Sequence, residues 1–141
     1  MGKNKYYEEY LGINFNKIKH ITFIGASVSC GSWTHKLIDL LRLDYPEITY
    51  NLCVIGATLS NTVLYLIDDI LDKHKPDLIF YEYYTGDCTA FIEKYKSMAN
   101  SQVNNMNNIS LNENNILMII ENILNKIRKK NIYLVFLNLF R

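Results

Sequence analysis

The sequence predicts an α/β fold, a three-layer sandwich in which helices cover both faces of a mostly parallel sheet of about four strands. Short apolar runs rich in β-branched and aromatic residues alternate with longer segments of helical periodicity. Three of these runs end in turn residues, at Gly25, Gly56 and Gly86. Because a parallel α/β sheet binds its ligands at the carboxyl ends of the strands, we expect these three turns to share one edge.

Two strand–helix steps occupy the amino-terminal half of the chain. The apolar content of Ile18 to Ile24 predicts a strand, and Trp33 to Leu43 has helical spacing. Pro46 ends the helical region, Ile48 to Ile55 predicts a second strand, and a helix is expected from about Asn61 to Lys73.

The second half begins with another strand and closes with a helix and a strand. Pro76 is followed by a predicted strand over Leu78 to Tyr84. The segment from Asn100 to Asn115 contains eight asparagines, so we expect a surface loop there. Ile116 to Lys130 is an amphipathic helix by its apolar spacing, and Ile132 to Phe140 predicts a fourth strand.

Composition, net charge and the length of apolar runs limit the partners and the cellular location that we expect. The 141 residues, 49% of them hydrophobic, fit a single domain over 1–141, which we expect to be incomplete because no helix follows the last strand. The net charge of +1 is spread along the chain, so nucleic acid is not an expected partner. No apolar run approaches the ~20 residues that span a bilayer, and the first ten residues do not resemble a secretory signal, so we expect a cytoplasmic protein.

The three cysteines do not indicate a metal centre. Cys30, Cys53 and Cys88 lack paired metal-ligand spacing, and in a chain without a secretory signal they are expected to be reduced structural thiols. We therefore expect no metal and no other cofactor.

Ser27 is the leading candidate for a nucleophile. The first apolar strand is followed by Gly25, Ala26 and Ser27, and a helix is predicted soon after. On such a turn a serine hydroxyl can stand above the sheet, beside backbone N–H groups that could hold an oxyanion. The same serine could instead cap the helix, because serine is a preferred N-cap residue.

The segments around the three turns read Phe23-Ile24-Gly25-Ala26-Ser27, Asn51-Leu52-Cys53-Val54-Ile55-Gly56-Ala57-Thr58 and Ile79-Phe80-Tyr81-Glu82-Tyr83-Tyr84-Thr85-Gly86-Asp87. Together they resemble the first three sequence blocks of the SGNH (GDSL-type) hydrolases, a family of esterases and acylhydrolases with a flavodoxin-like α/β fold. The resemblance covers most of the chain, from about residue 21 to residue 140. It implies that Ser27 is the nucleophile and that the backbone N–H groups of Ser27 and Gly56 bind the oxyanion.

Two positions depart from the family pattern. Ala26 stands where the family commonly has the aspartate of Gly-Asp-Ser. The third block typically reads Gly-x-Asn-Asp, and here Gly86 stands at the asparagine position while Asp87 matches. The resemblance thus implies that Gly86 is the third oxyanion-hole position but lacks a side-chain donor, a loss of roughly 3 kcal/mol of transition-state stabilisation unless another N–H substitutes.

The fourth block of the family, an Asp-x-x-His that supplies the acid and the base, is absent from these 141 residues. The resemblance therefore implies an esterase or acylhydrolase of a small-molecule or carbohydrate ester, incomplete or inactive as this chain. His35 lies two helical turns beyond Ser27 and is a poor candidate base. His20 and His74 are expected to be solvated at the surface.

Several other side chains have structural explanations that need no ligand. Glu82 is expected to be buried with a structural hydrogen bond, although a carboxylate at this edge could orient a base. The strand tyrosines are expected to pack against helices rather than to line a pocket, and the basic residues near the last helix end to form a solvated face. These are the tyrosines 81, 83 and 84 and the basic residues Lys126, Arg128, Lys129 and Lys130.

Two alternative functions remain open. The segment from Gly25 to Gly31 follows a strand and opens a helix, as in nucleotide-binding Rossmann-like modules. However, Ser29 replaces the middle glycine, and no acidic residue ends the second strand. The other alternative is a non-catalytic binding or docking module that forms an oligomer through an exposed sheet edge.

Overall fold

The computed structural model describes residues 9, 11–25, 32–54, 60–83 and 114–137. A short 3₁₀ helix, η1 (Phe15–Lys17), precedes the first strand. The strands are β1 (His20–Gly25), β2 (Thr49–Val54), β3 (Leu78–Glu82) and β4 (Tyr133–Phe136), and the helices are α2 (Ser32–Asp44), α3 (Ser60–His74) and α6 (Ile116–Lys129). The predicted strands and helices are confirmed, with ends that differ from the prediction by a few residues.

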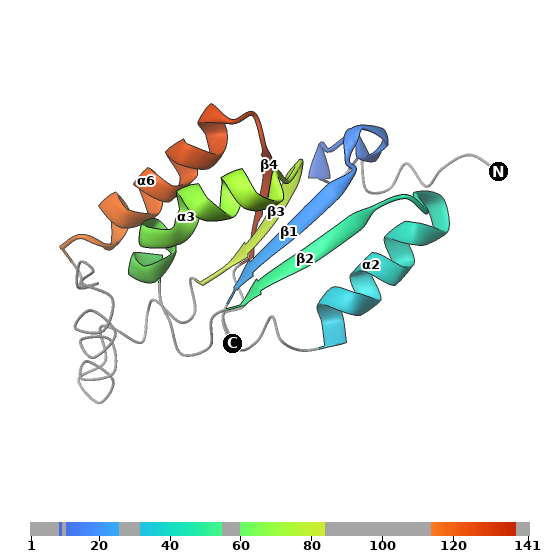
Figure 1. Ribbon diagram of the computed structural model, residues 1–141, viewed down its shortest axis with the longest axis horizontal. Coiled ribbons are helices and arrows are strands. Elements are labelled where there is room, and N and C mark those ends of the chain that lie inside the picture. The colour runs from blue at the N-terminus through green and yellow to red at the C-terminus, as the bar shows by residue number, and fades with distance from the viewer. Residues whose placement is uncertain (1–8, 10, 26–31, 55–59, 84–113, 138–141) are drawn as a thin grey trace.

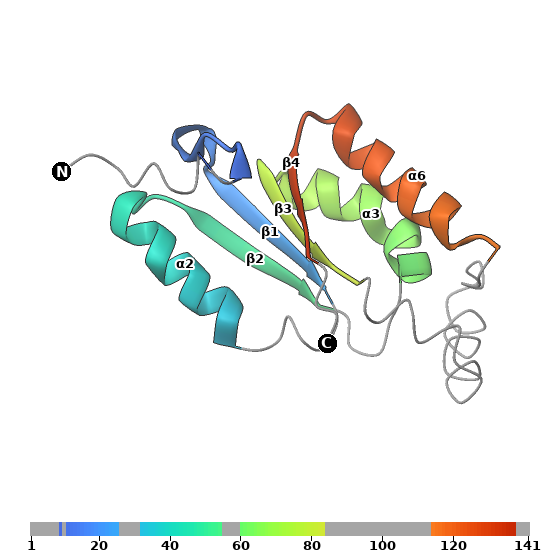
Figure 2. The same cartoon turned by 180° about the vertical axis from the view of Figure 1, so that it is seen from behind.

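The four strands form one parallel sheet in the order β2-β1-β3-β4. Helix α2 lies on one face, and α3 and α6 lie side by side on the other, which confirms the three-layer α/β architecture (Figures 1 and 2). β1 is paired on both sides, with β2 and with β3. The strand that leads to the Ser27 turn is thus an interior strand.

Two apolar cores sit on the two faces of the sheet because successive side chains of a strand point to opposite faces. Phe23 of β1 lies in the core under α2, together with Ile38 and Leu41. Ile24, the next residue, lies in the core under α3 and α6. Leu40, which shares the apolar spacing of α2, is 54% exposed and belongs to neither core.

Helix α6 packs as its apolar spacing predicts. Four of its isoleucines are buried against α3 and the sheet, and these are Ile116, Ile119, Ile123 and Ile127. Its basic carboxyl-terminal residues lie at the surface, as expected, but two of them have ion-pair partners. Lys126 and Lys130 pair with Asp68 and Asp72 of α3 at 2.6 Å and 2.8 Å, since the two helices lie side by side. None of the described helices is long and apolar enough to cross a membrane.

Candidate active site

The carboxyl ends of β1, β2 and β3 form one edge of the sheet. Gly25, the last residue of β1, is in register with Val54 at the end of β2 and with Glu82 at the end of β3. The three strand ends therefore lie in a row, as the sequence predicts. Figure 1 shows these three strands ending on the same side of the sheet.

The three candidate site residues follow this row but lie outside the described residues. Ser27 and Gly56 each come two residues after a strand end, at Gly25 and Val54, and Gly86 comes four residues after Glu82. Their roles as nucleophile and oxyanion-hole positions remain predictions.

The amino end of α3 is fixed to β3 by a buried hydrogen bond. The Oγ atom of Ser60 and the phenolic oxygen of Tyr81 are 2.5 Å apart, and neither side chain is more than 1% exposed. The Tyr81 ring also stacks on Phe136 of β4, with centroids 5.5 Å apart. Because α3 begins four residues after Gly56, this contact anchors the helix that follows the second turn. A serine at the start of a helix is a recognisable capping signal, but residue spacing does not indicate its partner Tyr81, which is 21 residues away.

Glu82 and the two strand tyrosines that the structure describes are buried, as their structural explanations predict. Glu82 is 2% exposed at the end of β3. Its side chain alternates with Tyr81 and Tyr83, which lie in the α3–α6 core, and is therefore on the α2 face of the sheet. Tyr81 and Tyr83 are buried and pack in that core, whereas Tyr84 lies outside the described residues.

His20 and His74 are half-buried and have partners, rather than being fully solvated at the surface as the sequence suggested. His20 begins β1, at the end of the sheet opposite Gly25, and its ring is hydrogen-bonded to Thr49 Oγ1 at 2.8 Å and to Asn51 Oδ1 at 2.6 Å. The His74 ring stacks against it, with centroids 6.4 Å apart. Burial lowers the pKa of His74, and the positive charge of Lys73 and the neighbouring His20 lower it further. The two rings lie in a structural contact between β1 and α3, away from the candidate site.

His35 is exposed on α2 and is hydrogen-bonded through Nδ1 to the hydroxyl of Tyr50 at 2.7 Å. Tyr50 is the second residue of β2, four positions before Val54. All three histidines of the chain thus have partners among the described residues that are not at the row of strand ends. That none of them is the general base remains a prediction.

A polar network on the α3 face links β1 to β2. Thr22 donates a hydrogen bond to Asn51 Oδ1 at 2.7 Å, and Asn51 Nδ2 donates to Cys53 Sγ at 3.2 Å. Burial raises the pKa of Cys53, against the smaller lowering effects of Asn51 and Lys73. A protonated, half-buried thiol fits the predicted structural role. The alternation of polar residues in both strands was the signal for this network.

Asp77 joins three strands at the opposite end of the sheet from the candidate site. Its Oδ2 atom accepts hydrogen bonds from the backbone N–H groups of Lys19 at 2.8 Å and His20 at 3.0 Å. Its own backbone N–H donates to the carbonyl of His20, and its carbonyl accepts from the N–H of Tyr133.

Among the described residues, no group of three or more His, Cys, Asp or Glu side chains could hold a metal ion.

The sequence profile of the GDSL-like lipase/acylhydrolase family matches residues 21–137, which is most of the chain. The chain belongs to the GDSL-like lipase/acylhydrolase family. The match includes all three predicted site positions of this family, Ser27, Gly56 and Gly86. The search of curated protein sequences found no match to this acylhydrolase-family chain.

Solved structures of esterases share the fold. The esterase EstA from Pseudoalteromonas sp. has a TM-score of 0.59 at 15% identity, over 84% of this chain and 58% of its own. The acetylxylan esterase Axe2 from Geobacillus stearothermophilus has a TM-score of 0.62 at 12% identity, over 84% and 58%. The acetyl xylan esterase AlAXEase has a TM-score of 0.61 at 14% identity, over 83% and 56%. This chain therefore spans less than two thirds of the esterases that it resembles.

Proposed function

We propose that this chain is part of a serine esterase or acylhydrolase in which Ser27 is the nucleophile. The observation that carries the proposal is the register of Gly25 with Val54 and Glu82, because it aligns the three strand ends from which the predicted site residues follow. The family match over residues 21–137 gives the chemistry expected at such an edge.

In the proposed reaction the Ser27 hydroxyl oxygen attacks the carbonyl carbon of an ester, and its proton passes to a general base. The tetrahedral intermediate carries an oxyanion, held by the backbone N–H groups of Ser27 and Gly56. Collapse expels the alcohol, which takes the proton, and leaves an acyl-serine that water then hydrolyses. At the third position, Gly86 can offer only its backbone N–H.

The general base and its acid partner are proposed to lie outside these 141 residues. Two observations support this part: all three histidines have partners elsewhere in the fold, and the chain spans only 56–58% of the three esterases compared. Without a base the serine loses most of its rate advantage, so the 141-residue chain is expected to be close to inactive.

A small-molecule or carbohydrate ester is the proposed substrate class. The support comes from the structural neighbours, which include an esterase and two acetylxylan esterases. An acetylated sugar and an aryl acetate are therefore the first substrates to try.

The first experiment is to read the coding region through and beyond Arg141 for an in-frame or frame-shifted Asp-x-x-His. Any longer polypeptide is then assayed for aryl acetate and acetylated-sugar hydrolysis beside the 141-residue chain. We expect turnover from the longer form only, reduced at least ~10³-fold by Ser27→Ala. Turnover that survives Ser27→Ala in a folded protein, checked by circular dichroism, would rule out the proposed nucleophile.

A further inference from the structure

Two histidine rings lie face to face where β1 meets the carboxyl end of α3. His20 is the first residue of β1, and His74 is the last residue of α3. Their ring centroids are 6.4 Å apart and the ring planes differ by 11°. Both residues are half-buried. The proposed esterase reaction uses neither ring.

The partners of His20 can bind its ring in either protonation state. The carbonyl oxygen Oδ1 of Asn51 can only accept, so its 2.6 Å contact with Nε2 of His20 places a hydrogen on Nε2. The Thr49 hydroxyl lies 2.8 Å from the other ring nitrogen, Nδ1, and 3.1 Å from the carbonyl oxygen of Lys19. It can donate to a neutral Nδ1, or accept from a protonated Nδ1 and donate to that carbonyl instead. Rotation of one hydroxyl thus keeps the hydrogen bonds of His20 when the ring takes up a proton.

His74 is in a different position. Within the described part of the chain, no hydrogen bond reaches its ring, and its contact is the stack on His20. Burial lowers the pKa of His74, and the charges of Lys73 and His20 lower it further. Lys19 and Lys75, which adjoin the two histidines in sequence, are exposed and add positive charge. A second proton on the pair must therefore enter among like charges.

The elements packed around the two rings offer little negative charge to offset that second proton. α3 contributes the cation Lys73. β2 contributes uncharged partners, including Cys53, whose pKa is raised by burial so that the thiol stays protonated. The connection between α3 and β3 contributes the carboxylate of Asp77, whose Oδ2 atom already accepts from two backbone N–H groups at 2.8 Å and 3.0 Å.

We propose that His20 and His74 form a two-step proton switch that holds the carboxyl end of α3 against β1. In the first step His20 takes up a proton, and the stack persists because the hydrogen bonds of His20 are kept. In the second step His74 is protonated as well, and repulsion between the two charged rings separates the last turn of α3 from β1. The buried contact between Ser60 and Tyr81 holds the other end of α3, so the release is confined to the carboxyl end.

The switch is independent of the proposed function. Every contact in it joins described residues of β1, β2 and α3, and none involves the predicted nucleophile or oxyanion positions. Its test therefore reads the two rings directly and needs no catalytic activity.

The test is proton NMR of the folded protein, in the full length that its coding region specifies, from about pH 8 down to about pH 4. Substituting each histidine by glutamine in turn assigns the Cε1–H resonances. In wild type, His20 is expected to titrate before His74 as the pH falls. The ring-current shift that each ring causes in the other is expected to be lost only in the second step.

The glutamine variants measure the coupling between the rings. His20→Gln removes the first charge and is expected to raise the midpoint of His74 by about 0.5 pH unit, the effect of a unit charge at the ring separation in a nearly aqueous surrounding. His74→Gln is expected to leave the midpoint of His20 nearly unchanged, because His20 takes its proton while His74 is still neutral. His35→Gln, on α2, is the matched control and is expected to move neither midpoint.

A second pair of variants tests the hydrogen bonds without touching either ring. Thr49→Val removes the acceptor for a protonated Nδ1 and is expected to move the midpoint of His20 to lower pH. Thr49→Ser keeps the hydroxyl and is expected to restore the wild-type midpoint.

An unchanged His74 midpoint in folded His20→Gln would overturn the proposal, because the two rings would then titrate independently. Ring-current shifts that persist after both histidines are protonated would also overturn it, since the stack would survive the second step. A His20 midpoint that Thr49→Val leaves in place would reject the hydrogen-bonded first step.

Discussion

The hydroxyl groups of Ser60 and Tyr81 lie 2.5 Å apart inside the molecule. They connect the first residue of α3 to the penultimate residue of β3. Both side chains are buried, so the contact is shielded from competing water. It lies at the start of the helix that follows the predicted oxyanion turn. Loss of this hydrogen bond should therefore lower the stability of the fold and also disturb the structure near the candidate site.

Tyr81→Phe is expected to destabilise the fold by about 1 kcal/mol or more, because it removes the hydroxyl of a buried hydrogen bond while keeping the ring. Urea unfolding followed by circular dichroism measures the change. Tyr65→Phe is the control, since Tyr65 lies on α3, the helix of Ser60, and is 59% exposed. Equal stability of the two variants would contradict the assigned contact.

Asp77→Ala is expected to destabilise the fold by about 1.5–3 kcal/mol, since one carboxylate oxygen accepts from the backbone N–H groups of both Lys19 and His20. Asp77→Asn keeps an acceptor oxygen and should lose less. Asp69, an exposed residue of α3, provides the control substitution Asp69→Ala. Hydrogen exchange at the Lys19 and His20 amides should accelerate in Asp77→Ala. Unchanged exchange there would argue against this role.

Asp72 gives a prediction for acidic pH. Its hydrogen bond to Lys130 holds the pKa of Asp72 below its ordinary value of 3.8, helped by the charges of Lys130 and Lys75. The group therefore stabilises the fold above its unfolded pKa, and this contribution is lost as the pH falls through the lower folded pKa. Unfolding of wild type and Asp72→Asn should differ at neutral pH and converge in acid. Because the pair is exposed, added salt should shrink the difference, and an insensitive difference would speak against an ion pair.

His74 gives a pH dependence of the same direction as Asp72 but at higher pH, because its pKa is also lowered on folding. Burial, with Lys73 and His20, holds the pKa of His74 below its ordinary value of 6.5. The unfolded chain then binds the proton more readily, so stability falls as the pH drops below 6.5 and levels off once the folded group is also protonated. His74→Gln should flatten this part of the stability curve. His35→Gln is the control, because His35 is exposed on another helix. A curve that keeps its slope in His74→Gln would reject the assignment.

Local patterns predicted the strands and helices well where burial is one-sided or complete. Helix α6 was predicted to within one residue because its isoleucines recur at helical spacing. The start of β3 was predicted correctly and its end two residues too late, and its five residues are all buried. The ion pairs of Lys126 and Lys130 with α3 were missed, because their partners are 58 residues away in sequence. Which helices lie side by side is a property of tertiary packing that residue spacing does not encode.

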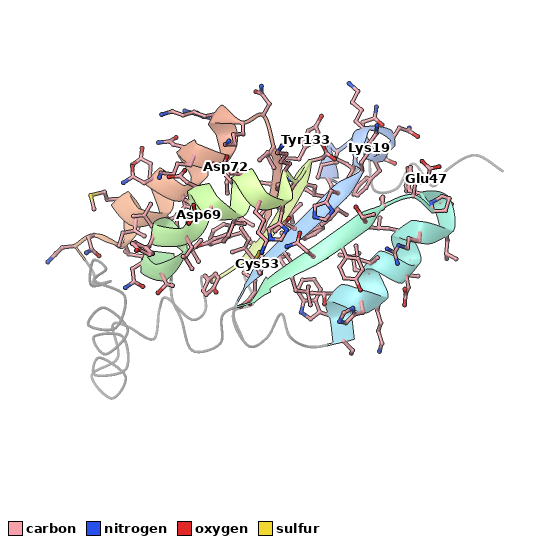
Figure 3. The ribbon with its side chains drawn as sticks, in the orientation of Figure 1. Lys19, Glu47, Cys53, Asp69, Asp72 and Tyr133 are labelled. Carbon is pink, nitrogen blue, oxygen red and sulfur yellow. The ribbon has the colours of Figure 1, made fainter. Side chains whose placement is uncertain are left out.

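The candidate site was predictable in its framework but not in its chemistry. Turn residues after apolar strands indicated one shared edge, and the register of Gly25 with Val54 and Glu82 confirms it. The surroundings of the histidines could not be predicted from the sequence. His74 has lysines on both sides in the sequence, which suggests a solvated side chain, yet its ring stacks on His20. Figure 3 shows labelled Lys19 and Cys53 toward opposite ends of the sheet. The polar network between β1 and β2 includes Cys53, one residue before Val54 in the row of strand ends, and its hydrogen bonds depend on cross-strand register.

The interior position of β1 also sets the order in which the chain can fold as it leaves the ribosome. β1, α2 and β2 are consecutive, so this unit can form as soon as Val54 has emerged. The second neighbour of β1 is β3, which arrives later, and at synthesis rates of about 5–20 residues/s the delay between Gly25 and Glu82 is roughly 3–11 s. During that interval one side of β1 has no strand partner, and the nascent chain is exposed to pairing with other chains or to binding by chaperones.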